Sequence, residues 1–434
     1  MPKIVLNRIS AWLSLACLLL VSGVAAAQDG GLSPEERIVI SAEGERKVPI
    51  LLETFTGGLG VTAEDVRAVE SVLESDLNYA DLFQIVRIPV LMEGDTVPAG
   101  QARALVRAMV ELSQGELQLR GSLESLPERG VILSRTYRGS PEIYRELAHR
   151  FADDIVLFLT GRTGIARTKV TFISDKSGAR EVYVVDYDGH GLRPLTQNGS
   201  INMSPAWSPD GTGVVFVSYL AGDADIHLAD VRSGKTRKVV GGHGVQSAPA
   251  YAPDGSRIAY SNTSGNESEI YVCAPDGSGV RRVTRSSGIN TSPGWSPDGR
   301  RIVYTSDRSG TPQIYVVDAD GGSPQRLTFT GQWNDLGSWS PNGDKIAYAT
   351  RKDGLFRIAL VDPSGLGSGR DATFGPGSDE DPSWAPNGRH LVFSSTRGWQ
   401  KWLYIVDTDT GWVLPLVVGC GNHSAPDWSG VPDR

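Results

Sequence analysis

The sequence predicts a mainly β protein: a six-bladed β-propeller, closed by its C-terminal strand and preceded by a small α/β domain. Three observations lead to this prediction. Glycine and proline supply 51 and 25 of the 434 residues and methionine only 4, a composition that favours tight turns over helical bundles. An aromatic residue with a turn motif recurs every 44 or 45 residues. A segment of mixed helical and strand patterns precedes these repeats.

The N-terminus has the pattern of an export signal. Two basic residues precede a largely apolar stretch, and Ala25-Ala26-Ala27 matches a signal-peptidase site. We interpret residues 1–27 as a secretory signal peptide, with an uncleaved anchor as the alternative. A lipoprotein signal at Cys17 fits less well, because Ser14 stands where an aliphatic residue is required. No other stretch is apolar and long enough to span a bilayer, so we expect no membrane span.

Charge and cysteine content exclude further classes of partner and site. The 42 basic and 50 acidic side chains give a net charge of −8, which disfavours nucleic acid and anionic lipid surfaces as partners. Cys273 and Cys420 lie in different repeats, so we expect two unpaired thiols, with a disulfide as the alternative. No C-x-x-C pair is present, and we expect a monomer without cofactor or metal.

The repeat unit combines an aromatic residue, Ser or Ala, Pro, Asp or Asn, and Gly. The spacings are 44, 44, 44, 45 and 44 residues, a period typical of propeller blades. Proline and glycine fit a type I turn, and short β-rich segments joined by polar loops and hairpin turns follow each one. Four strands per unit make one blade. The aromatic positions are Trp207, Tyr251, Trp295, Trp339, Trp384 and Trp428.

The first and last repeats are both incomplete. Residues 169–196 provide three strands without the preceding aromatic motif, whereas Pro426-Asp427-Trp428 provides the motif without following strands. The economical solution is one shared blade, in which the C-terminus donates the inner strand. Closing the ring in this way removes exposed sheet edges. We therefore predict six blades over residues 168–434.

The preceding α/β domain is predicted to cover residues 45–162, after an N-terminal interaction segment at 28–44. Thr62 is expected to cap a helix over 63–78, and Ser140-Pro141 to start a second helix that ends near Gly161. The predicted strands are 47–55, 83–88, 105–112, 116–123 and 131–137.

Each inner strand is entered by a polar residue, so we expect a polar ring around one mouth of the axial channel. These six residues are Asn202, Gln246, Asn290, Asn334, Asp379 and His423. The following positions add Met203, Ser204, Ser247, Ala248, Thr291, Ser292, Asp335 and Glu380. We interpret this rim as a surface that captures a peptide or protein, more acidic on one side; ordinary polar loop chemistry is the alternative. The tryptophans of the repeat are expected to pack between blades.

The sequence contains no recognisable catalytic motif. It lacks a G-x-S-x-G elbow, an H-E-x-x-H pair and a Walker A loop, and its six histidines show no pair at ligand spacing. We predict no catalytic residues and no enzymatic activity.

Several stretches resemble one known family. They are Ile38-Val39-Ile40, residues 182–189, residues 203–211 and residues 305–315. Together with the order of signal peptide, α/β domain and six blades, they resemble the TolB family of periplasmic propeller proteins in the Tol-Pal system. The blade motif alone is shared by many propellers, whereas the domain order is more specific.

The resemblance implies a non-catalytic interaction protein in the periplasm of a Gram-negative bacterium. It implies that the propeller mouth binds the lipoprotein Pal and that an N-terminal segment binds TolA, with other outer-membrane proteins as further candidate partners. Such a protein supports outer-membrane integrity and constriction at cell division, and systems of this type are also used for protein import. The TolA segment would comprise Arg37, Ile38, Val39 and Ile40.

A second hypothesis remains open: a secreted enzyme or a carbohydrate-binding propeller that uses the axial channel. An enzyme would need several convergent acid-base groups or metal ligands. The predicted rim offers one histidine, His423, among amides and hydroxyls, which suit recognition better than proton transfer.

Overall fold

The computed structural model describes residues 47–92, 95–97, 100–242, 244–286, 288–366 and 369–432. The predicted signal peptide, the segment 28–44 and the candidate TolA residues Arg37–Ile40 lie outside the described residues. Within the described part, neither helix has the length and apolar character needed to cross a membrane.

The N-terminal region is built on a mixed sheet with the strand order β3-β1-β4-β5-β6. The strand β1 runs parallel to both β3 and β4, whereas β4, β5 and β6 form an antiparallel meander. A short strand, β2, also pairs with β4. The bounds are β1 (Val48–Glu53), β2 (Thr56–Gly57), β3 (Phe83–Ile88), β4 (Ala104–Ser113), β5 (Glu116–Ser125) and β6 (Val131–Gly139).

Both predicted helices are confirmed. The first, α1 (Ala63–Tyr79), begins at a capping box in which Thr62 and Asp65 exchange side-chain and backbone hydrogen bonds. A 3-10 turn, η2 (Pro141–Ile143), leads into α2 (Tyr144–Thr160). This helix ends at Gly161, whose left-handed backbone (φ 67°) suits glycine.

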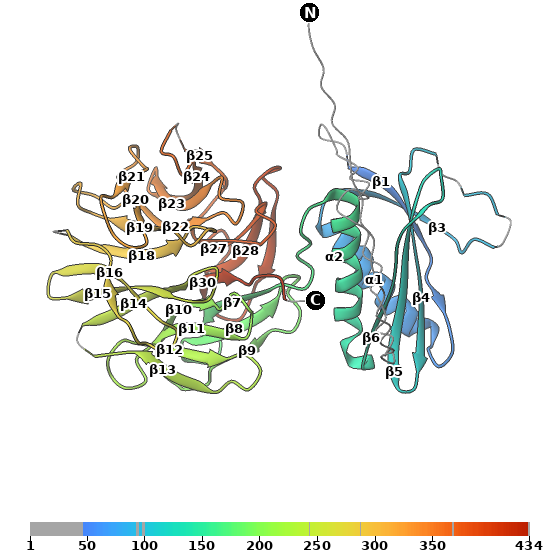
Figure 1. The fold of residues 1–434 in the computed structure, drawn as a ribbon, viewed down its shortest axis with the longest axis horizontal. Coiled ribbons are helices and arrows are strands. Elements are labelled where there is room, and N and C mark those ends of the chain that lie inside the picture. Colours follow the sequence, from blue (N-terminus) through green and yellow to red (C-terminus); the bar gives the residue numbers. More distant parts are fainter. Residues whose placement is uncertain are drawn as a thin grey trace, which may run out of the picture. The chain divides into compact units, whose positions relative to one another are not determined.

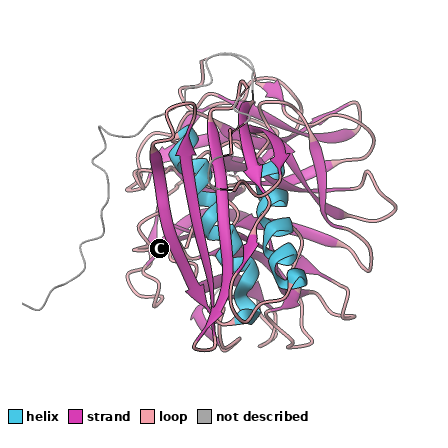
Figure 2. Cartoon of the chain, turned by 90° about the vertical axis from the view of Figure 1, so that its right-hand side faces the viewer, coloured by secondary structure: helices cyan, strands magenta, loops and turns pink. Residues whose placement is uncertain are grey.

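Both helices pack on the same face of the sheet, as Figure 2 shows with the helices in cyan. Their apolar stripes supply Leu73, Leu147 and Phe151, all of which are fully buried. The opposite face carries a smaller apolar cluster around Leu51 and Leu105. The sheet and helices therefore form one α/β core, as the periodicity of the sequence predicted.

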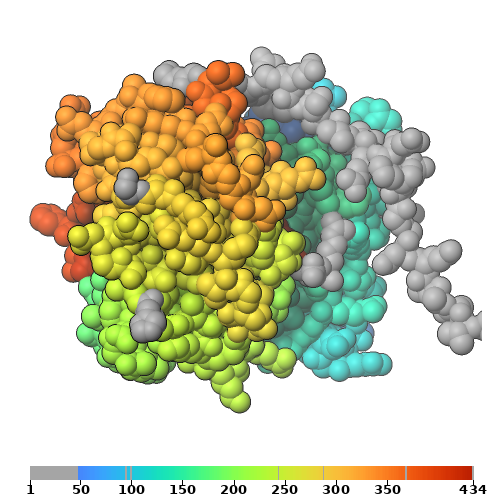
Figure 3. Space-filling model, turned by 60° about the vertical axis from the view of Figure 1, so that its left-hand side comes forward, coloured from blue at the N-terminus to red at the C-terminus, as the bar shows by residue number. Residues whose placement is uncertain are grey.

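Six four-stranded antiparallel sheets form the propeller (Figures 1 and 3). We number the blades from one to six and give their strands from the inner to the outer edge. Blades one and two are β30 (His423–Trp428), β7 (Lys169–Ser174), β8 (Glu181–Asp186), β9 (Arg193–Pro194); and β10 (Asn202–Trp207), β11 (Gly213–Ser218), β12 (Asp225–Asp230), β13 (Thr236–Val240). Blades three and four are β14 (Val245–Tyr251), β15 (Ile258–Ser264), β16 (Glu267–Cys273), β17 (Arg281–Arg282); and β18 (Asn290–Trp295), β19 (Arg301–Ser306), β20 (Gln313–Asp318), β21 (Gln325–Arg326). Blades five and six are β22 (Asn334–Trp339), β23 (Ile346–Lys352), β24 (Leu355–Val361), β25 (Arg370–Asp371); and β26 (Asp379–Trp384), β27 (His390–Ser395), β28 (Trp402–Asp407), β29 (Val413–Val417).

The predicted ring closure is confirmed. The last strand, β30, pairs antiparallel with β7, so the red C-terminal strand lies beside the green one in Figure 1. The indole Nε1 of Trp428 donates a hydrogen bond to Thr168 Oγ1 at 2.8 Å, and the amide of Ser429 donates to Lys169 O at 2.8 Å. Side-chain and backbone bonds thus join residues about 260 positions apart.

The tryptophans of the repeat lie between neighbouring blades, as predicted. Trp295 packs with residues of blade three as well as with its own blade, and the guanidinium of Arg257 lies 4.6 Å from its ring centre. The guanidinium of Arg301 likewise lies 4.7 Å from the ring centre of Trp339. The repeat motif therefore encodes the contact between blades as well as a turn.

The two described cysteines are unpaired, in agreement with the prediction. Cys273 is buried within β16, whereas Cys420 lies exposed in the connection that leads to β30.

We expect Trp428→Ala to lower the free energy of unfolding by about 3–5 kcal/mol, because it removes a buried aromatic side chain at the closure. Trp428 is 5% exposed, whereas Trp412 is 68% exposed and provides a matched control. Urea unfolding of both variants measures the difference. Equal losses for the two substitutions would contradict a closing role for Trp428.

Candidate functional site: the propeller mouth

The strand directions define two different ends of the propeller. The Pro-Asp-Gly and Pro-Asn-Gly turns connect each inner strand to the second strand at one end. The connections that enter the inner strands lie at the other end, together with the loops between second and third strands, because neighbouring strands are antiparallel. We call this second end the mouth. Figure 3 shows successive blades of the propeller surface in green, yellow and orange.

The six residues predicted to ring the mouth lie at or next to the start of their inner strands, but their side chains are buried. Asn290 is representative: its amide donates to Glu269 Oε2 at 2.9 Å, and this carboxylate belongs to the preceding blade. Asn202 with Glu181 and Asn334 with Gln313 repeat the arrangement, at 3.0 and 2.9 Å. These three amides therefore hold the inner strands of blades two, four and five to the preceding blade.

Two further residues of the ring, Asp379 and His423, are instead fixed by contacts within their own blade or with the connection that enters it. Asp379 accepts two hydrogen bonds from Arg397 Nη2, both at 2.9 Å. The imidazole of His423 contacts Ser174 Oγ at 3.0 Å and Gly419 O at 3.2 Å. Burial lowers the pKa of His423, which favours its neutral form. Direct contact of these ring residues with a partner remains a prediction; the interactions described here position the mouth loops.

The second residue after each of these polar residues lines the axial channel. Ser204, Ala248, Ser292, Leu336, Asp381 and Ala425 all have a left-handed backbone, with φ between 48° and 59°. The pairing register shifts at the same place in all six blades, which identifies a repeated β-bulge. Non-glycine residues in this conformation are strained, so a six-fold repetition marks a feature that the fold maintains.

The channel behind the bulges has a cavity volume of about 340 Å³. Its lining includes the bulge residues, prolines next to them in the repeat, and Trp207, Trp295 and Trp339. The predicted residues Ser204, Ala248 and Ser292 lie in this lining. The structure thus brings the third rim position of several blades together around one cavity.

The predicted acidic side of the rim is largely compensated. Lys401 lies 2.8 Å from Glu380 Oε2 and 3.5 Å from Asp381 Oδ2, and Arg397 neutralises Asp379. Asp335 accepts hydrogen bonds from Thr305 Oγ1 and from the amide of Leu336, and burial raises its pKa. The mouth is therefore less acidic than the residue types alone indicate.

One carboxylate lies deeper in the channel wall. Asp427 accepts hydrogen bonds from the amide of Trp207 in blade two, at 2.8 Å, and from Ser383 Oγ in blade six, at 3.0 Å. Burial raises the pKa of Asp427 to about 6. The equivalent residues in blades two to six are Ala206, Ala250, Gly294, Ser338 and Ser383.

A second ring at the mouth was not predicted from the sequence. Ile201, Val245, Ile289 and Trp333 each precede the polar residue that enters an inner strand, and all four are exposed. The mouth loops also expose Tyr219, Leu220, Phe329, Phe374, Trp399 and Val418. An apolar residue at the same offset in four consecutive repeats was the available signal. Exposed apolar side chains gathered at one end of a protein mark an interaction surface.

The chemistry of the described mouth suits recognition. Both ring nitrogens of His423 already have partners, and the carboxylates of Asp379 and Asp427 accept hydrogen bonds from protein groups. None of these three side chains therefore offers a free acid-base group to a reacting molecule. The apolar rim, by contrast, presents area that a partner can cover.

A family model described as the TolB β-propeller domain matches residues 157–432, more than half of the chain. The chain belongs to the TolB β-propeller family. The matched residues begin near the end of α2 and include all six blades.

Individual TolB proteins are similar over shorter stretches. The chain is 33% identical over 187 residues to a "Protein TolB homolog" of Chlorobium chlorochromatii, covering 41% of this chain and 42% of the relative. It is 38% identical over 107 residues to the "Tol-Pal system protein TolB" of Geobacter metallireducens, covering 25% of each. The alignments thus span less than half the length of these relatives.

The comparison with solved structures covers more of the fold. The crystal structure of TolB from Acinetobacter baumannii matches with a TM-score of 0.76 and 25% identity, over 90% of this chain and 98% of that one. The α/β region and the propeller therefore occur together in a TolB protein of known structure.

We expect Asp427→Asn to stabilise the protein at pH 7.5 but not at pH 4. The folded-state pKa of Asp427, about 6, lies above the ordinary value near 3.9, so the native state loses stability as the pH rises from about 4 through 6. This rise in the pKa of Asp427 lowers the free energy of unfolding at pH 7.5 by about 3 kcal/mol at most. Urea unfolding of both proteins at the two pH values measures it. An equal effect of the substitution at both pH values would contradict the buried-carboxylate assignment.

Proposed function

We propose that this TolB-family chain is a non-catalytic interaction protein of the Tol-Pal system in the periplasm of a Gram-negative bacterium. Its mouth binds the lipoprotein Pal, and its N-terminal residues Arg37–Ile40 bind TolA. Through these contacts it supports outer-membrane integrity and constriction at cell division. The observation that carries the proposal is the ring of exposed apolar side chains at the mouth.

Several properties of the mouth support a protein partner. Exposed aromatic side chains such as Trp399, which is 98% exposed, are typical anchors of protein interfaces. The bulged inner strands, and hydrogen bonds between blades such as that of Asn290 with Glu269, hold the mouth loops in place before a partner binds. This order reduces the conformational entropy that is lost on binding. The predicted rim residues Met203, Ser247 and Thr291 lie half-buried beside the apolar ring, where the hydroxyls of Ser247 and Thr291 can add specificity.

The alternative is an enzyme or a carbohydrate-binding propeller that acts through the channel. The channel has room for a small ligand, with its cavity of about 340 Å³. The family membership and the partnered state of His423 and Asp427 favour the interaction protein.

We expect Ile289→Asp to weaken Pal binding at least tenfold, because a carboxylate placed inside an apolar contact loses its hydration without gaining a partner. Ile289 is 51% exposed at the mouth, and Val280 is 53% exposed at the opposite end, so Val280→Asp is a matched control. Calorimetric titration with the soluble domain of Pal from the same organism measures both.

The outcomes separate the two parts of this proposal. Tight binding by the wild type and by Val280→Asp, with loss in Ile289→Asp, supports the mouth as the Pal site. Equal affinity for all three proteins would move the site elsewhere on the chain. No binding of Pal by the wild type at about 100 μM would overturn the function itself, since specific complexes bind well below this concentration.

We expect deletion of residues 28–41 to abolish capture of TolA while leaving Pal affinity unchanged, because the proposed Pal site lies on the propeller, whose strands are formed by residues 169–428. Pull-down with the periplasmic domain of TolA measures this. Retained capture by the shortened chain would contradict the N-terminal assignment.

A further inference from the structure

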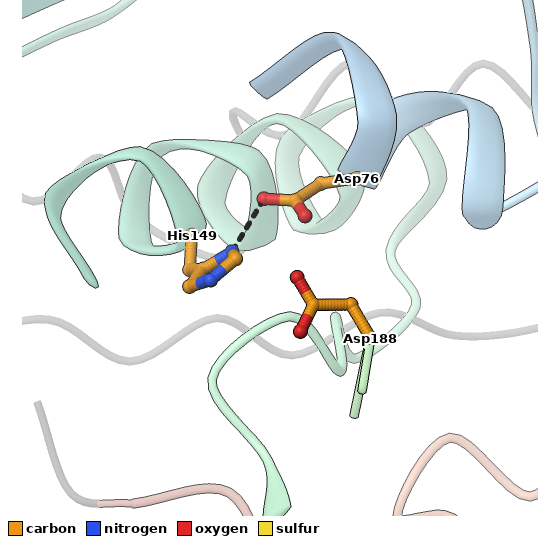
Figure 4. Close-up of side chains that lie close together, drawn as sticks. All are labelled: Asp76, His149 and Asp188. Carbon is orange, nitrogen blue, oxygen red and sulfur yellow. Dashed lines mark hydrogen bonds and ion pairs between the residues drawn. The ribbon is translucent and has the colours of Figure 1, made fainter. Parts of the chain in front are cut away.

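Away from the mouth, the helices of the α/β region contact blade one through a charged cluster in which Asp76 and His149 are buried and Asp188 is half-buried. Figure 4 shows its three members: Asp76 from α1, His149 from α2 and Asp188 from the turn after β8. The imidazole Nδ1 of His149 lies 2.7 Å from Asp76 Oδ2. One ligating atom from each of the three side chains lies within 4.8 Å of the others.

The neighbouring residues complete the hydrogen bonding of both carboxylates. The hydroxyl of Tyr187 donates to Asp76 Oδ1, and the guanidinium of Arg145 pairs with Asp188 Oδ2. The amide of His190 donates to Asp188 Oδ1 at 3.1 Å. The network thus connects α1 and α2 directly to the turn of blade one.

The charges of this cluster do not cancel while the imidazole is neutral. Asp76 and Asp188 contribute two negative charges, and Arg145 contributes one positive charge. A net charge of −1 in a buried position is unfavourable. His149 is only 5% exposed, and its Nε2 is buried without a hydrogen-bond partner in the described structure.

The groups that surround the cluster do not supply the missing charge. On α1, Tyr79 is buried, and burial raises its pKa well above the usual range, so that it stays neutral. On α2, Asp153 is paired with Arg167 at 2.9 Å. The pKa of Tyr187 is likewise raised by burial.

Blade six faces the same junction with groups that are neutral or already paired. Burial lowers the pKa of His390 to about 4, so its imidazole is uncharged at neutral pH. Arg389 pairs with Asp407 and also lies 3.8 Å from Asp81 Oδ2. Its Nη1 donates to Ala80 O at 3.3 Å, which links blade six to the end of α1.

A proton fits this site better than a metal ion does. The Nδ1 atom of His149 and one oxygen of Asp76 are hydrogen-bonded to each other, and the guanidinium of Arg145 lies against Asp188. A divalent ion would have to break the first contact and would be repelled by the guanidinium. A proton added to the Asp76–His149 pair requires no rearrangement and brings the net charge to zero.

We propose that the Asp76–His149–Asp188 cluster takes up one proton when α1 and α2 pack against blade one, so that a falling pH tightens this junction. Burial raises the pKa of Asp76, which agrees with a higher proton affinity in the packed state. By linkage, the state that binds the proton more tightly is favoured as the pH falls. The proton belongs to the coupled pair rather than to one residue.

Hydrogen exchange of the full chain between pH 5 and 8, corrected for the intrinsic exchange rate, tests this proposal. We expect protection of the segments around Ala80 and Tyr187 to rise as the pH falls, by up to tenfold per pH unit for one proton. Asp188→Asn and Asp76→Asn should each remove this dependence. Asp223→Asn, an exposed acid in the loop between β11 and β12, is the control and should retain it.

Each outcome decides the proposal. Protection of the backbone amides of β19 reports whether the propeller of a variant is folded. If one of the two cluster variants does not fold, the other still tests the proposal. A wild-type junction whose protection does not change with pH would overturn the proposal, as would an unchanged dependence in both cluster variants. Zinc chloride added to the wild type should not raise protection; a rise that requires Asp188 would assign the site to a metal ion instead.

Discussion

The pairing of β30 with β7 is the interaction on which the rest of this structure depends. It joins the two ends of the repeat array and gives the first blade its inner strand. Without it, β10 and β26 would lose their neighbour on one side, and the channel would be open along its length. Two residues of β30 make these connections. Asp427 accepts hydrogen bonds from blades two and six, and Trp428 donates one to Thr168.

At the mouth, one position of the repeat contributes to stability and the adjacent position is available for recognition. The polar residue that enters each inner strand is buried, and in blades two, four and five its amide holds the strand to the preceding blade. The residue just before it is exposed and apolar in four blades, where it adds nothing to the core. Two adjacent positions therefore have opposite roles, because the chain turns at this point from a surface loop into a strand.

The buried cluster at Asp76 and His149 places ionisable groups at a junction that apolar packing alone would make insensitive to pH. The same region contains the aromatic contact of Tyr79 with Tyr187, at 4.9 Å between ring centres. Apolar and aromatic contacts stabilise the junction between the helices and blade one, and the charged groups make its stability depend on protonation. The proposed Pal site at the mouth and the proposed proton site use different residues, so each can be tested in the absence of the other.

The sequence by itself determined the six blades, their closure and both helices, because turn motifs, apolar periodicity and caps such as Thr62 act over a few residues. It also identified the rim positions, but not which side chains are exposed there. Only the tertiary structure decided that Asn290 faces a neighbouring blade, that Lys401 and Arg397 compensate the acidic rim, and that Asp188 meets His149. These outcomes depend on contacts between residues far apart in the chain, and no local pattern specifies them.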